Sequence, residues 1–85
     1  MDLEAQLARL AAVLEQARLL DPRGPADEIF GLAKAYGKDA RHFLDQKRRE
    51  DAIEAFGISW AYLDALLHMG LLEVPEEFLD WFTVD

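Results

Sequence analysis

Apolar side chains recur at intervals of three and four residues along most of this 85-residue sequence. The clearest run is a heptad-like seam in the first segment, formed by Leu3, Leu7, Leu10, Leu14 and Ala17. This spacing places apolar side chains on one face of an α-helix, and the thirteen alanines of the chain add high helix propensity. Few residues are β-branched, so strands have little local support. The pattern therefore predicts an all-α fold.

Capping residues and helix breakers set the limits of the first helix, which we expect to run from about residue 2 to about residue 20. Asp2 suits the N-cap position, because its carboxylate can accept a hydrogen bond from a free N–H group of the first turn. The stretch DPRGP, residues 21–25, ends this helix, since Pro22 cannot continue the hydrogen-bond ladder. Pro25 then suits the first turn of a second helix.

Two further helices follow from the same pattern. The second is expected to run from Pro25 to about residues 45–47, with a stripe made of Ile29, Ala33, Tyr36, Ala40 and Phe43. The third is expected to begin near Arg49 and to end at Gly70, which suits a left-handed C-cap. Its expected buried residues are Ala52, Phe56, Ser59, Trp60, Leu63, Leu66 and Leu67.

The C-terminal segment EVPEEFLDWFTVD contains what we call the C-terminal hook, residues 75–82. Pro75 and the two glutamates after it indicate a short helical turn, which displays Phe78, Leu79, Trp81 and Phe82. Four large apolar side chains in so short an element must be buried, either across the open end of the same chain or on a partner. These four residues are the candidates for an interaction site.

The length of the chain allows one domain with a single shared core. The connections between the predicted helices are short, which favours antiparallel neighbours. We therefore predict a single domain, residues 1–85, folded as an antiparallel three-helix bundle with a short C-terminal helical turn.

Charge and composition exclude several classes of function. The net charge is −8, and all nine Lys and Arg residues lie within residues 1–49, whereas residues 50–85 contain only acidic charges. Such a field repels phosphate backbones and argues against nucleic-acid binding. The absence of cysteine removes thiolate chemistry and cysteine-ligated zinc. No apolar run approaches the ~20 residues of a membrane span, and the N-terminus is acidic, so we expect a cytoplasmic protein without a membrane partner.

Asp64 and His68 are the one pair that resembles a reaction site, because a spacing of four residues places both on one helix face. A structural pair at the helix end is the simpler interpretation, since the helix dipole favours a protonated histidine there. Ser59 lies five positions before Asp64 and is expected to pack as a small interface residue. His42 is on another helix, so too few ligands gather for a metal, and no cofactor is expected.

Two charged clusters have similarly simple interpretations. Lys34, Lys38 and Arg41 share one side of the second helix, and residues 47–49 add a basic turn. This surface could hold an anion. It could equally be a solvated face in which Arg41 pairs with Asp45. An acidic cluster follows near the C-terminus, and its spacing does not fit a calcium loop. We expect it to be a solvated helix start, formed by Glu73, Glu76, Glu77 and Asp80.

Two motifs stand out in residues 33–72, AKAYGKDARHFLDQKRREDAIEAFGISWAYLDALLHMGLL. The first contains Ala33, Tyr36, Asp39, Ala40 and Phe43, and the second contains Ala52, Glu54, Ala55, Ala61, Asp64, Ala65 and the pair Gly70 and Leu71. In these residues the chain resembles the archaeal family known as domain of unknown function 357. Where that family tends to have glycine and then aspartate, this chain has Lys47 and Arg48. The resemblance implies a small α-helical protein and assigns no activity.

The sequence favours a non-catalytic protein-interaction or structural module over an enzyme. Its partner would be a second copy of the chain or another protein, bound through apolar helix faces. Val13, Leu19 and Leu20 supply apolar surface beyond the seam of the first helix, which favours a homodimer. The alternative is a small ligand-binding or catalytic domain that uses Asp64 and His68, with Lys38 and Arg41 as anion contacts.

Overall fold

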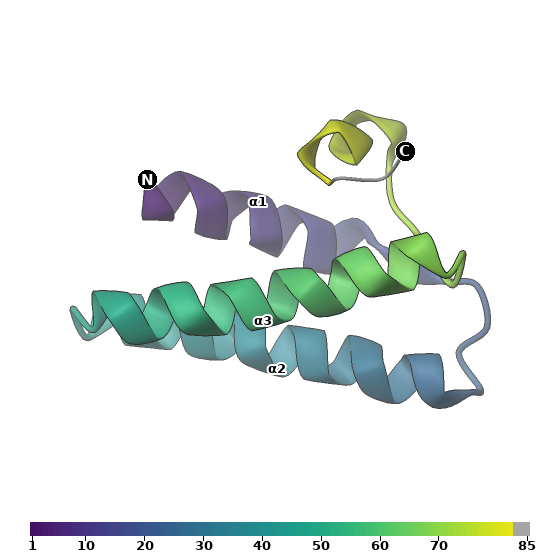
Figure 1. Cartoon of the computed structure of the whole chain (residues 1–85), viewed down its shortest axis with the longest axis horizontal. Helices are drawn as coiled ribbons and strands as arrows, with labels where there is room; N and C mark the ends of the chain where they lie inside the picture. Colours follow the sequence, from purple (N-terminus) through teal and green to yellow (C-terminus); the bar gives the residue numbers. More distant parts are fainter. Residues whose placement is uncertain (83–85) are drawn as a thin grey trace.

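The computed structural model describes residues 1–82, and this part of the chain is mainly helical (Figure 1). It contains three long helices, α1 (Leu3–Gln16), α2 (Pro25–Asp45) and α3 (Arg49–His68). Two short strands, β1 (Arg18–Leu19) and β2 (Leu72–Glu73), and a 3₁₀ helix, η1 (Glu76–Trp81), complete it. The all-α prediction therefore holds in broad terms, with a strand pair that the sequence did not indicate.

The first helix begins where the sequence predicts and ends early. The carboxylate of Asp2 accepts a hydrogen bond from the backbone N–H of Ala5 at 3.1 Å, which makes Asp2 the N-cap. The predicted end near residue 20 is wrong, because α1 stops at Gln16 and the next residues are extended. They pair with β2 in antiparallel register, Arg18 opposite Glu73 and Leu19 opposite Leu72. Hydrogen bonds to a distant segment have replaced the last turn of the helix.

The second and third helices begin and end close to their predicted limits. Pro25 opens α2, and Gly70, with φ of 70°, is the left-handed residue just after α3. Lys47 is also left-handed, with φ of 62°, in the tight turn between α2 and α3. The N–H of Arg48 donates to the carbonyl of Phe43 at 2.8 Å, which closes this turn. A residue with a Cβ pays a conformational cost at such a position, where glycine would not.

The most extensive contact in the described chain is between α2 and α3. Figure 1 shows α2 running in the opposite direction to α1 and α3. Small buried side chains line the α2–α3 contact and allow the two backbones to approach closely, namely Ala33, Ala40, Ala52, Ala55 and Ser59. The hydroxyl of Ser59 donates to the carbonyl oxygen of Ala33 at 2.6 Å, so the one buried polar side chain in the described core has a partner.

α1 packs against both other helices, with its seam facing inward. Its buried residues are Leu3, Leu7, Leu10 and Val13. Gly37 of α2 lies close to α1, since a Cβ added there would lie 2.6 Å from Cδ1 of Leu14. Val13, one of the three residues expected to supply surplus apolar surface, is fully buried, and Leu19 is half-buried, whereas Leu20 is 52% exposed. The apolar surplus of the first segment is therefore smaller than the sequence suggests.

Candidate functional site

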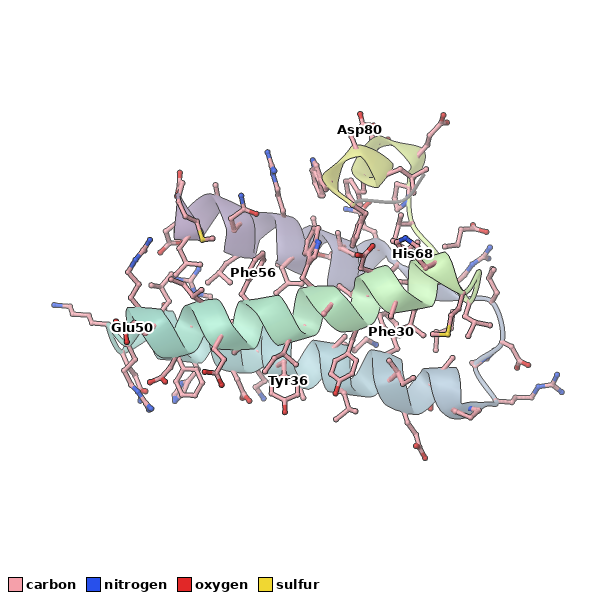
Figure 2. The ribbon with its side chains drawn as sticks, in the orientation of Figure 1. Phe30, Tyr36, Glu50, Phe56, His68 and Asp80 are labelled. Carbon is pink, nitrogen blue, oxygen red and sulfur yellow. The ribbon has the colours of Figure 1, made fainter. Side chains whose placement is uncertain are left out.

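Asp64 and His68 meet at the C-terminal end of α3. Nδ1 of His68 lies 2.9 Å from the carbonyl oxygen of Asp64 and 3.3 Å from its carboxylate Oδ1. The His68 side chain is half-exposed, and Figure 2 shows it at the end of α3 near η1. Ser59 is turned to Ala33 in the core, and His42 belongs to the lining of a groove on α2. Within residues 1–82, neither Ser59 nor His42 therefore joins Asp64 and His68 as a second catalytic group.

The C-terminal hook packs on its own chain. The rings of Phe78 and Trp81 stack with centroids 4.4 Å apart, and Phe82 stacks on Trp60 of α3 at 4.3 Å. Phe78 and Phe82 are buried and Trp81 is half-buried. Leu79 differs from these three, because it is 40% exposed. Of the four candidate interaction residues, Leu79 is thus the one whose side chain is most available to a partner.

The hook also contacts α1 through Arg9. The guanidinium of Arg9 lies over the ring of Trp81, with Cζ 5.3 Å from the ring centroid. Figure 1 shows η1 beside the C-terminal half of α1. Asp80 lies on the outer edge of η1 in Figure 2. Glu76, Glu77 and Asp80 are exposed and form no ion pair within residues 1–82, and all three lie within three positions of the exposed Leu79 in the sequence.

A groove of about 620 Å³ lies between α1 and α2. Its apolar lining consists of Leu7, Leu10, Ala11, Leu14 and Gly37. Because a side chain on Gly37 would displace Leu14, the glycine allows Leu14 to lie against α2. Asp64 and His68 are not part of the lining, whereas Lys38 and Arg41 are. The structure therefore does not bring together the four residues of the ligand-binding alternative.

Arg41 is the most constrained cation of the groove. Its Nη1 and Nη2 atoms each lie 3.0 Å from a carboxylate oxygen of Glu4, and Nη2 also lies 3.0 Å from Oδ1 of Asp45. The predicted pair with Asp45 is present, and a second carboxylate from α1 joins it. These hydrogen bonds from Arg41 lower the pKa of Glu4 and raise the pKa of Arg41. Arg41 therefore ties α1 to α2 and is already neutralised.

Lys34 and Lys38 complete the basic side of the groove and remain available. Neither lysine forms an ion pair within the described chain. Nζ of Lys34 lies 4.5 Å from the ring centroid of Phe30, which is a cation–π contact and leaves the charge in place. Both residues are exposed. The groove thus combines an apolar lining with two lysines and one glutamate, Glu15, that form no ion pair within the described chain.

The other charged clusters are paired only in part. In the basic turn, Arg48 forms an ion pair with Asp51 at 2.9 Å, and Arg49 donates to the carbonyl oxygen of Met1 at 3.1 Å. Among the acidic residues, Glu73 pairs with Arg18 across the strand pair at 3.1 Å. Within residues 1–82, no three acidic or histidine side chains gather as metal ligands.

Sequence reasoning found the basic residues of α2 and missed the groove. The residues of α1 that line the groove depend on which side of that helix meets α2. Local periodicity does not specify that side. Gly37 was the available signal, because a glycine inside a helix costs stability and often marks a close approach of two backbones. The pairing of Glu4 with Arg41, 37 positions away, has no local signature.

These features define a small, mainly helical protein with an apolar groove at its surface. The chain belongs to the family described as "Protein of unknown function (DUF357)", whose sequence model matches residues 3–72. The match includes all three long helices and ends before η1. No curated protein and no solved structure matches the chain. None of the helices in residues 1–82 has the length and apolar character to cross a membrane.

Proposed function

We propose that this protein is a non-catalytic interaction module, built as an antiparallel three-helix bundle with a short C-terminal turn, which associates with a second copy of itself through apolar helix faces. The observation that supports this proposal is the groove between α1 and α2, where Leu7, Leu10 and Leu14 form an apolar lining. Grooves between helices commonly receive an apolar element of a partner.

The location of charge supports a protein partner with acidic residues. Lys34 and Lys38 on α2 and Glu15 on α1 border the groove without ion pairs in the described chain, so the two lysines outnumber the one carboxylate there, while the net charge of the protein is −8. A partner segment that carries apolar and acidic side chains would satisfy both features of the groove. The second half of this same chain has that composition, since residues 50–85 hold no Lys or Arg.

Sedimentation equilibrium from micromolar to millimolar concentration tests this function. We expect the mean mass to rise with concentration from the 9.7 kDa of the monomer toward twice that value. A mass that stays at 9.7 kDa over the whole range would overturn the proposal.

A pair of matched variants tests whether the groove is the face involved. Ala11→Glu places a charge in the apolar lining, whereas Ala35→Glu places the same charge on an exposed site of α2 outside the lining. We expect Ala11→Glu to reduce association strongly and Ala35→Glu to reduce it little. Equal effects of the two variants would place the interface elsewhere.

A further inference from the structure

Two surfaces of this chain are complementary to each other and cannot meet within one molecule. The groove lies where α1 faces α2, and it presents apolar side chains beside Lys34 and Lys38. The hook lies against Trp60 of α3 and Arg9 of α1, and it presents Leu79 among carboxylates. The hook is thus held on the α1–α3 side, away from the groove of its own chain.

We propose that the groove between α1 and α2 receives the C-terminal hook of a second copy of the chain. Leu79 enters the apolar lining, and the carboxylates of Glu76, Glu77 and Asp80 face Lys34 and Lys38. This inference rests on the proposed function and names both the occupant of the groove and the residues that contact it.

The dimensions of the two surfaces agree. The part of α2 that lines the groove runs from Lys34 to Asp45, about 16 Å of α-helix at 1.5 Å per residue. η1 has six residues, about 12 Å at the 2.0 Å rise of a 3₁₀ helix. η1 is therefore shorter than the part of α2 that lines the groove.

The packing of the hook leaves Leu79 as the residue to be covered. Phe78 and Phe82 are buried and Trp81 is half-buried by contacts within the chain, so the hook is held in place before a partner arrives. A preformed element loses little conformational freedom on docking. In a two-fold dimer each copy would give its hook and receive one, so that both grooves are filled and assembly stops at two.

Disulfide trapping tests the contact directly, because the natural chain has no cysteine. The variant Ala11→Cys, in the groove lining, is mixed with an isotope-labelled Leu79→Cys variant under mild oxidation. A disulfide requires Cα atoms within about 7 Å, so the mixed cross-link forms efficiently only if the hook enters the groove. The control pairs Leu79→Cys with Ala35→Cys, on exposed α2 outside the lining. We expect at least a tenfold higher yield for the Ala11 pair, and equal yields would overturn the proposal.

Charge reversal gives a second test with its own internal control. Variant A carries Lys34→Glu and Lys38→Glu, and variant B carries Glu76→Lys and Glu77→Lys. From the natural net charge of −8, A changes to −12 and B to −4. We expect each variant alone to self-associate at least tenfold more weakly than the natural chain, and the equimolar mixture of A and B to recover natural affinity. The mixture pairs an acidic groove with a basic hook and a basic groove with an acidic hook.

Variant B separates docking at this site from a general charge effect. If net repulsion alone governed association, B would bind itself more tightly than the natural chain, because its net charge is smaller. The double variant Arg23→Glu and Lys47→Glu also has a net charge of −12 and alters residues outside the groove, so it should lose much less affinity than A.

The outcomes distinguish the inference from the proposed function. If the natural chain dimerises while A, B and their mixture all behave like it, the interaction module stands and the hook is not the occupant of the groove. If the natural chain shows no self-association at any concentration, both proposals are overturned.

Discussion

Replacing Gly37 with alanine measures how closely α1 approaches α2. Alanine is about 1 kcal/mol more favourable than glycine inside a helix. At Gly31 of the same helix nothing lies within 4 Å of an added Cβ, so Gly31→Ala should gain that amount. At Gly37 the added Cβ would lie 2.6 Å from Cδ1 of Leu14, which must move. Because Cδ1 is the end of a flexible side chain, its displacement should cost the lower end of the roughly 1–3 kcal/mol of overpacking, about 1 kcal/mol, so Gly37→Ala should be about neutral.

Thermal unfolding followed by circular dichroism reports this difference. For a domain of this size 1 kcal/mol corresponds to about 4–8 °C in Tm, so Gly31→Ala should melt about 4–8 °C higher than the natural chain. Gly37→Ala should show no gain or a loss. In a Leu14→Ala background the obstacle is gone, and Gly37→Ala should then stabilise as Gly31→Ala does, a coupling of about 1 kcal/mol. If Gly37→Ala alone raises Tm as much as Gly31→Ala, the close approach of α1 to α2 is not present.

Three further changes have defined outcomes. Lys47→Gly should raise the free energy of unfolding by about 0.5–1 kcal/mol, because glycine carries no Cβ penalty at the left-handed φ of 62°; urea denaturation checks this. Ser59→Leu should destabilise by about 3 kcal/mol or more and Ser59→Ala by about 1 kcal/mol, since the first overfills a buried site and the second loses the hydrogen bond to Ala33. Arg41 lowers the pKa of Glu4 in the folded chain. The Glu4 carboxylate therefore contributes its full stabilisation above the ordinary pKa of glutamate and loses it as the pH falls through the lowered pKa. The Tm difference between Glu4→Gln and the natural chain should shrink on acidification below about pH 4.

The helices were predictable wherever local signals decide. Asp2 and Pro25 mark helix starts, and Gly70 follows the end of α3 in the left-handed conformation that glycine favours. α1 was predicted too long because Ala17 and Arg18 are compatible with a helix and no breaker precedes Pro22. The N–H of Leu20 instead donates to the carbonyl of Leu71 at 3.0 Å, a partner that only the tertiary fold supplies.

The candidate site was predictable in part for the same reason. Lys34, Lys38 and Arg41 were grouped correctly, since helical spacing fixes which residues of one helix share a side. The apolar half of the groove comes from α1, and the way two helices meet depends on packing over their whole length. The sequence also left undecided whether the hook residues are buried on their own chain or on a partner, because a short aromatic segment has the same sequence in both cases.

A dilution series of amide spectra of the ¹⁵N-labelled chain tests the central claim most directly. The account predicts that signals from the groove residues of α1 and α2 and from η1 shift together as concentration rises, with a single dissociation constant. Signals from the opposite face, where the ring centroids of Tyr36 and Tyr62 lie 6.2 Å apart, should stay in place. Spectra that do not change with concentration, or changes confined to that opposite face, would contradict the account.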